Sequence, residues 1–158
     1  MSTENDGRND FDFLIGMWKV YHRMLTQRLK ESTDWVEFEG DTVARKILNG
    51  LGNLDENMIH MPTGVVHAMT LRLFNPHLKE WSIHWSTDRM GTLDIPMIGG
   101  FKDGQGLFYA QEIFESRHVY SRFIWSKFMA NSCQWEQALS ADGGRTWETN
   151  WIMEFKRV

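Results

Sequence analysis

Large apolar residues occupy every second position over several stretches of the chain, and small or polar residues lie between them. The clearest stretch is Trp81-Ser82-Ile83-His84-Trp85, and the alternation returns from Trp147 to Phe155 and from Trp18 to Met24. A two-residue period is typical of a β-strand with one apolar face. We therefore expect these segments to line one continuous sheet surface, the inside of a barrel.

The pattern predicts about ten short strands after one turn of helix over residues 11–16. The expected strands cover residues 17–29, 35–48, 51–61, 65–75, 79–87, 91–100, 106–114, 117–128, 131–140 and 146–157. Because no helical segment separates them, they should form an antiparallel meander. The predicted fold is all-β, a closed antiparallel up-and-down barrel of about 8–10 strands. It should be a single domain over residues 1–158, with residues 1–9 as a flexible tail.

Pro96 and the pair Gly99-Gly100 interrupt the sixth expected strand. Proline lacks the N–H that a sheet ladder needs, so inside a strand it belongs at a bulge or an edge. The irregular strand is either a bulge that turns a barrel corner or a place where the barrel opens toward a ligand.

Composition favours a barrel with an apolar cavity. The 158 residues are 42% hydrophobic and include 8 Trp, 10 Phe and 10 Met, and Met packs adaptably around irregular apolar shapes. The net charge of −4 and the scattered Lys and Arg argue against a nucleic-acid partner. No apolar run approaches the ~20 residues of a membrane span, and the polar N-terminus lacks a secretory signal, so we expect a cytoplasmic protein.

Metal, thiol and cofactor chemistry find little support in the sequence. Cys133, the single cysteine, is expected to be a buried structural thiol rather than a nucleophile. No two histidines have the two-apart or four-apart spacing of a metal site, and no phosphate-binding motif is present. We expect no metal and no cofactor, with a single inward His22 or His67 as axial haem ligand left as an alternative.

The parity of the strands assigns side chains to two faces. If Trp18 points inward, so do His22, Met69, Leu71, Trp81, Ile83, Trp85, Phe123, Trp125, Trp135, Gln137, Trp151 and Met153. Apolar walls with a few hydrogen-bonding groups are typical of a small-molecule pocket. We expect this pocket at the barrel end away from Trp18, with Trp81, Trp85, Trp125, Trp135 and Trp151 as walls and His22 and Gln137 as polar contacts. The alternative is that the aromatic side chains fill the barrel completely.

On the opposite parity lie Arg72, His84, Arg122, Glu136 and Asn150. These residues either form ladders on a solvated outer face, or a bulge reverses the parity locally. In the second case Arg72 or Arg122 binds a carboxylate or enolate, and His84 acts as an acid or base. Arg72 is therefore an expected ligand-binding residue, and His84 and Arg122 are the candidate catalytic residues.

Three motifs carry a family resemblance. They are Phe11-Asp12-Phe13 with Gly16 and Trp18, then residues 101–108 (FKDGQGLF), then residues 140–151 (SADGGRTWETNW). The first is similar to the Gly-x-Trp start of lipocalin-like barrels, in which the tryptophan plugs the closed end. Together they resemble a family of small bacterial calycin-like proteins classed as a domain of unknown function. The resemblance implies a lipocalin-like or fatty-acid-binding-protein-like barrel and supplies no catalytic residues.

The segment from Ser140 to Trp147 also resembles the Asp-box of sialidases, in which an aspartate binds backbone amides and an aromatic ring packs beneath. Only one copy is present, which argues against a propeller. We expect Asp142 and Trp147 to form a structural turn.

Two functions remain open from the sequence. The first is binding of a mid-sized hydrophobic small molecule. The second is a cofactor-independent isomerase, cyclase or lyase that holds a hydrophobic substrate in a reactive conformation. A homodimer is left open as the oligomeric state.

Overall fold

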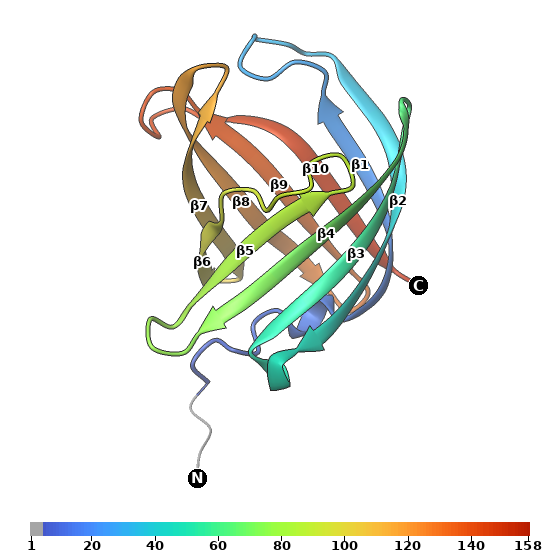
Figure 1. Cartoon of the computed structure of the whole chain (residues 1–158), viewed down its shortest axis with the longest axis vertical. Coiled ribbons are helices and arrows are strands. Elements are labelled where there is room, and N and C mark those ends of the chain that lie inside the picture. The colour runs from blue at the N-terminus through green and yellow to red at the C-terminus, as the bar shows by residue number, and fades with distance from the viewer. Residues whose placement is uncertain (1–4) are drawn as a thin grey trace.

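Within residues 5–158, which the structure describes, ten antiparallel strands close on themselves into a barrel (Figure 1). The strands of this computed structural model are β1 (Gly16–Leu25), β2 (Trp35–Ile47), β3 (Gly52–Met61), β4 (Gly64–Asn75), β5 (Glu80–Thr87), β6 (Met97–Lys102), β7 (Gln105–Phe114), β8 (Arg117–Met129), β9 (Ser132–Ser140) and β10 (Glu148–Arg157). Each strand pairs with the next in sequence, and β1 pairs with β10. The closed up-and-down barrel predicted from the sequence is confirmed, and so is the short N-terminal helical turn, η1 (Asp12–Leu14).

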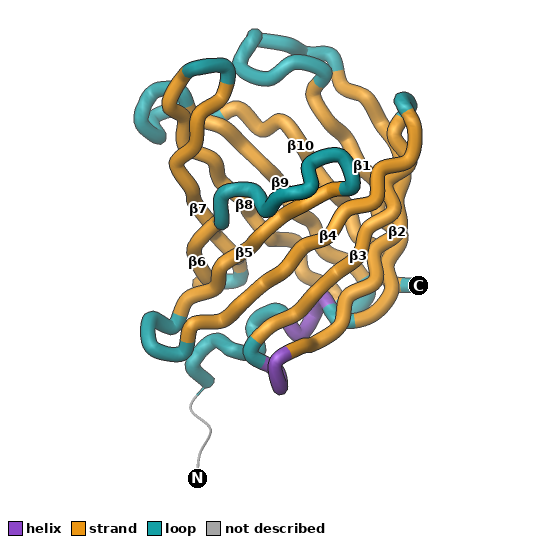
Figure 2. The backbone as a smooth tube through the Cα atoms, in the orientation of Figure 1, coloured by secondary structure: helices purple, strands orange, loops and turns teal. Residues whose placement is uncertain are grey.

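The sixth strand is the one whose predicted position is wrong by more than a few residues. It was expected over 91–100 but spans Met97–Lys102, and residues 88–96 form a loop (Figure 2). Pro96, which has no N–H to donate, directly precedes the strand. At Gly99 a Cβ atom would lie 1.9 Å from the carbonyl oxygen of Leu107, so only glycine fits this crossing. The ladder between β5 and β6 has three residue pairs, and it leaves one wall of the barrel short.

The N-terminal segment closes one end of the barrel. Trp18 is buried and donates from its indole N–H to the carbonyl of Leu14 over 2.7 Å. The guanidinium of Arg157 lies 4.1 Å from the centre of the Trp18 ring and donates to the carbonyls of Ile15 and Phe13. Trp18 thus plugs this end, as the sequence predicts.

Phe11 extends the plug into the barrel. It is fully buried, with Trp81 at 5.0 Å and Phe101 at 4.9 Å between ring centroids, both edge-on. Of the predicted flexible tail 1–9, residues 1–4 lie outside the described residues, and the carbonyl of Gly7 accepts a hydrogen bond from the Trp81 indole.

The predicted face of β4 is wrong. Thr70, Arg72 and Phe74 are buried, whereas Met69 and Leu71 are half-buried on the opposite face. Both parities of this strand contain large apolar residues, so alternation alone does not assign its inner face. No register shift separates β4 from β3 or β5, so Arg72 faces the interior without a bulge.

Asn150, expected on the outer face, is fully buried. A register shift between Thr149 and Trp151 interrupts the pairing of β10 with β9 at this residue. A bulge of this kind turns a side chain to the other face, and the Asn150 carbonyl accepts from the amide of Gln137 over 2.8 Å.

The turn between β9 and β10 has the expected construction. The Asp142 carboxylate accepts from the backbone N–H groups of Arg145 and Thr146 and from the Ser140 and Thr146 hydroxyls. These bonds hold the pKa of Asp142 at about 2, with the Thr146 hydroxyl as the largest cause. Trp147 donates to the carbonyl of Gly144 over 3.1 Å.

Among the described residues, no helix combines the length and apolar character needed to cross a membrane.

Candidate functional site

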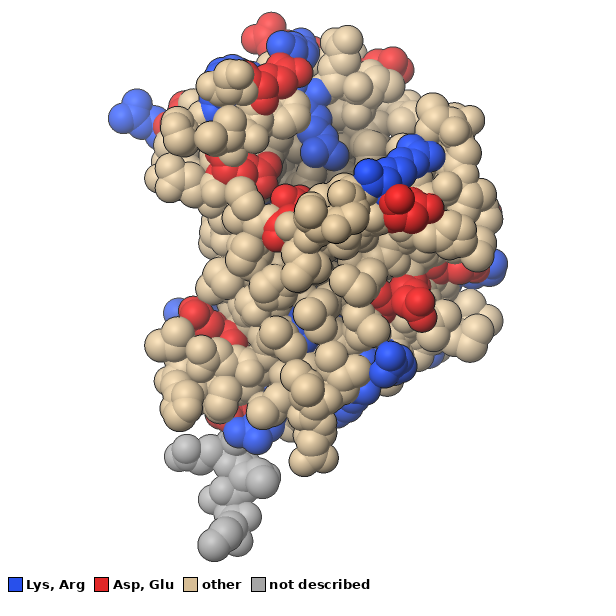
Figure 3. Space-filling view, viewed as in Figure 1, with Lys and Arg blue, Asp and Glu red and all other residues tan. Residues whose placement is uncertain are grey.

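The barrel interior holds a cavity of about 200 Å³. Nineteen side chains or backbone segments line it: Arg28, Asp55, Asn57, Thr70, Arg72, Ile83, Trp85, Asp94, Ile95, Met97, Glu112, Ser121, Phe123, Trp125, Trp135, Gln137, Trp151, Met153 and Phe155. Figure 3 shows a hollow in this side of the molecule with acidic and basic side chains on its rim. The aromatic residues therefore do not fill the barrel completely.

A buried ion pair lies in the wall of the cavity. Arg72 and Asp55 are 4% and 2% exposed, and Nη1 of Arg72 lies 2.7 Å from Oδ2 of Asp55. The same nitrogen donates to the side-chain carbonyl of Asn53 over 3.0 Å. Asp55 also accepts from the amide of Asn57 and from the backbone N–H of Thr70. β3 and β4 thus place a hydrogen-bonded polar network inside a largely apolar barrel.

Two N–H groups at this wall have no acceptor among the described residues. They are Nε of Arg72 and Nε1 of Trp125. Trp125 is 2% exposed, and the guanidinium carbon of Arg72 lies 5.7 Å from its ring centroid. Buried donors in folded proteins nearly always have a partner, so these two groups mark a place where a bound molecule can accept hydrogen bonds.

Aromatic rings form the apolar walls. Trp151 meets Trp135 edge-on at 5.4 Å and Trp85 edge-on at 6.0 Å, and Phe123 packs against Trp135 at 4.8 Å. Edge-to-face contacts of this kind fix the ring orientations. The rings offer a bound molecule large, stiff apolar surfaces.

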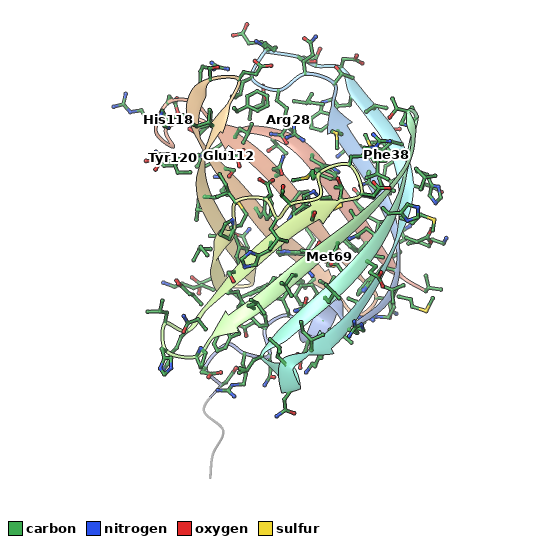
Figure 4. The ribbon with its side chains drawn as sticks, viewed as in Figure 1. Arg28, Phe38, Met69, Glu112, His118 and Tyr120 are labelled. Atoms are coloured by element: carbon green, nitrogen blue, oxygen red, sulfur yellow. The ribbon has the colours of Figure 1, made fainter. Side chains whose placement is uncertain are left out.

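Charged residues surround the end of the cavity away from the plug, where Figure 4 places Arg28 and Glu112. Arg28 belongs to the loop between β1 and β2, which Glu148 holds by accepting from the N–H of Leu29 over 2.7 Å. Burial lowers the pKa of Arg28, partly offset by Glu112 and Glu148. Burial also raises the pKa of Glu112, and the charge of Asp94 adds to that rise.

The structure brings six of the ten candidate residues named from the sequence to the cavity wall. These are Arg72, Trp85, Trp125, Trp135, Gln137 and Trp151. Their role in binding stays a prediction, but their positions on strands β4, β5, β8, β9 and β10 make one continuous lining.

The other four residues lie away from the cavity lining. His22 lies behind Trp151 and stacks on Phe38, and Trp81 packs in the plug. His84 is on the opposite face from Ile83 and Trp85 and contacts Ser82 over 3.0 Å. The Arg122 guanidinium covers the Trp147 ring at 4.3 Å. His84 and Arg122 therefore do not meet each other at the cavity.

Several lining residues were not named from the sequence. Asp55 and Asn57 belong to an alternating polar run, Asn53-x-Asp55-x-Asn57, and that period marks a polar inner face. Glu112 follows Phe108 and Ala110 at two-residue spacing, so the sequence also indicated that Glu112 shares their strand face. Nothing in the local pattern indicates that Arg28 and Asp94, which lie in loops, reach the cavity.

Cys133 is buried, and its burial raises the pKa of the thiol to about 12. This agrees with the expected structural thiol, because the thiolate is the reactive form. Within residues 5–158, no three His, Cys, Asp or Glu side chains come together as a metal site.

No protein-family model matches this chain, and no curated protein matches it at a significant level. The cavity and its lining residues are therefore the basis for a functional assignment.

Proposed function

We propose that this barrel binds a compact hydrophobic small molecule in its interior cavity. The observation that carries the proposal is the cavity of about 200 Å³ between the Trp85, Trp135 and Trp151 rings. Burial of apolar ligand surface supplies the driving force, and tryptophan rings lose little conformational entropy on contact.

The size of the cavity narrows the ligand class. An apolar cavity of about 150 Å³ binds benzene, whereas drug-sized ligands occupy roughly 300–1,000 Å³. A volume of about 200 Å³ suits one substituted ring or a small bicyclic skeleton. A long fatty acyl chain exceeds it.

The test is a titration with camphor, followed by tryptophan fluorescence and by isothermal calorimetry. Camphor does not absorb where tryptophan emits, so a change in emission reports occupancy. Binding at micromolar to low millimolar concentration is the expected result. Ser121→Leu fills the cavity from its buried wall and should abolish binding, whereas Ser82→Leu, on the other face of β5, should leave binding unchanged.

Native mass spectrometry of protein from its own host should show a copurifying small molecule.

Equal binding to wild type and to the Ser121→Leu variant would place the ligand outside the barrel. Failure of compact cyclic compounds to bind at all would refute the proposed function.

A second candidate function, proton transfer on the bound molecule, is favoured by Glu112. This carboxyl group lines the cavity, and burial raises its pKa, a combination that suits a general base or acid. Acetophenone provides a test, because a base that removes a methyl proton in heavy water returns a deuteron. Wild type should speed this exchange, measured by proton nuclear magnetic resonance, and Glu112→Gln should not. An uncatalysed rate with wild type rejects this candidate.

We also propose that the chain is a member of the bacterial calycin-like family that its motifs resemble. The closed meander and the position of Gly16 and Trp18 at the plugged end support this assignment.

A further inference from the structure

The two unpartnered donors of the cavity belong to strands that lie across the barrel from each other. Arg72 is on β4 and Trp125 on β8, and β5, β6 and β7 separate them in the sheet. Their side chains nevertheless meet in the interior, where the Arg72 guanidinium carbon lies 5.7 Å from the Trp125 ring centroid. Both residues line the cavity and are more than nine-tenths buried. One oxygen atom with two lone pairs can accept from two such donors.

The charge of this region is already balanced. Asp55 pairs with Arg72 over 2.7 Å, and Asn53 accepts a second bond from the same guanidinium nitrogen. A ligand carboxylate here would add a second anion beside the buried Asp55. Burial of an uncompensated charge is far more costly than burial of a neutral acceptor. The site is therefore suited to an uncharged oxygen.

Phe11 and Trp125 border the guanidinium with their rings, at 5.2 and 5.7 Å from its carbon to the ring centroids. These rings supply no acceptor, and they hold the guanidinium against its partners on β3. The direction of the Arg72 Nε–H group is therefore set before a ligand enters, which reduces the entropy lost on binding.

From these contacts we infer that the ligand carries a neutral carbonyl oxygen, as in a ketone, aldehyde, ester or amide, and that Arg72 Nε and Trp125 Nε1 bind it. This inference rests on the proposed function, because it names the polar group of the compact ligand in the same cavity. The competing acceptor is a trapped water molecule. If water accepts from both donors instead, a carbonyl ligand should bind no more tightly than a hydrocarbon of equal shape.

The experiment compares three probes of nearly equal shape by calorimetry. Acetophenone has the carbonyl, α-methylstyrene replaces the oxygen with a methylene group, and benzoate carries a charged carboxylate. Wild type should bind acetophenone at least about tenfold more tightly than either of the others. A site built for hydrogen bonding rejects an analogue that leaves its buried donors unpaired.

Trp125→Phe keeps an aromatic ring and removes the N–H, so it should reduce the preference for acetophenone over α-methylstyrene to about threefold or less. Trp135→Phe is the matched control, because it shortens a wall of the cavity and removes neither of the two unpartnered donors. It should weaken both probes and leave their ratio unchanged. Infrared spectroscopy of carbonyl-labelled acetophenone on wild type gives an independent reading, since two donated hydrogen bonds lower the carbonyl stretching frequency.

The outcomes separate the two claims. Equal binding of acetophenone and α-methylstyrene, or an unshifted carbonyl band, overturns the carbonyl site and leaves hydrophobic binding intact. Tighter binding of benzoate overturns the argument from charge balance. No binding of any probe overturns both the carbonyl site and the proposed function.

Discussion

The indole N–H of Trp151 donates to Nδ1 of His22 over 3.2 Å. His22 therefore carries its ring proton on Nε2 and is neutral in this arrangement. Its ring stacks on Phe38 at 4.9 Å between centroids. A Cβ atom at position 40 would lie 3.0 Å from Nε2, so Gly40 leaves room for the imidazole. His22 is thus a buried support for Trp151, and Trp151 is a wall of the cavity.

Stability should fall as His22 becomes protonated. Burial lowers the pKa of His22 from 6.5 to about 4, so the unfolded chain binds more protons between these two values. The contribution of neutral His22 to the free energy of unfolding is complete above pH 6.5 and is lost as the pH falls toward 4. It amounts to up to about 3 kcal/mol of unfolding free energy. Urea denaturation of wild type and His22→Gln at pH 7 and pH 4 measures this contribution. Between pH 7 and pH 4 the variant should lose less free energy of unfolding than wild type does.

His118→Gln is the control for this measurement, because His118 is exposed at the rim of the barrel (Figure 4). It should lose as much stability as wild type on acidification. Parallel losses for wild type and His22→Gln would contradict the role of His22.

Removal of one partner of the Arg72–Asp55 pair should be strongly destabilising. Arg72→Met leaves Asp55 as a buried charge without its cation, and we expect a loss of about 3–5 kcal/mol in the free energy of unfolding. The double variant Arg72→Met/Asp55→Asn removes the charge as well and should recover at least about half of that loss. Urea denaturation of the single and double variants at pH 7 measures both.

Lys46→Met is a matched control, since Lys46 pairs with Asp12 over 2.8 Å on the surface. That variant should change stability by less than about 1 kcal/mol. Similar losses for Lys46→Met and Arg72→Met would show that burial adds nothing to the Arg72 pair.

Trp18 should dominate the stability of the plugged end. Its ring is 2% exposed and lies between the Leu14 carbonyl and the Arg157 guanidinium. Trp18→Ala should cost about 3–5 kcal/mol. Trp35→Ala removes a ring that is 36% exposed and should cost less than about 1 kcal/mol. A Trp18→Ala protein with a wild-type melting temperature would show that the plug is dispensable.

The sequence predicts the strands other than the sixth well because they are eight or more residues long and several end at turns that contain glycine or asparagine, such as residues 48–50, 103–104 and 141–144. Trp81-x-Ile83-x-Trp85 is unambiguous because one parity is apolar and the other is polar. The sixth strand is too short for a period to establish itself. Its ladder with β5 has three pairs, so Pro96 and the following glycines were the better guide to its boundary.

The site was predictable in its walls but less so in its polar groups. Tryptophans on alternating positions share a face by geometry alone, which placed Trp85, Trp135 and Trp151 together. Arg72 was harder, because a buried arginine depends on a partner from another strand, and Asp55 sits 17 positions earlier. Loop residues such as Arg28 and Asp94 have no period that indicates where they point.

Cys133 should resist modification in the folded protein. The thiol is 5% exposed, and its burial raises its pKa to about 12, so almost no thiolate is present at neutral pH. Ellman's reagent at pH 8 should react with it over hours in buffer and within seconds to minutes in 6 M urea. Rapid reaction in buffer would show that β9 opens readily to solvent.

Glu112→Gln should stabilise the folded barrel at neutral pH. Burial raises the pKa of Glu112 above 4.5, and Asp94 adds to the rise, so the folded state holds its proton more tightly than the unfolded chain does. Stability therefore falls as the pH rises from 4.5 through the folded pKa, and the ionised carboxylate is a net cost above it. Gln has the same shape without the charge, and the expected gain at pH 7 is under about 1 kcal/mol, because Arg28 offsets part of the cost. The gain should vanish near pH 4, where both states are protonated.

Glu154→Gln, at an exposed position of β10, should show no such pH-dependent difference. A carboxylate kept in the cavity wall at a cost to stability is what a site selected for binding or proton transfer shows. A destabilising Glu112→Gln would mean instead that the attraction between the charges of Glu112 and Arg28 outweighs the cost of burying the carboxylate.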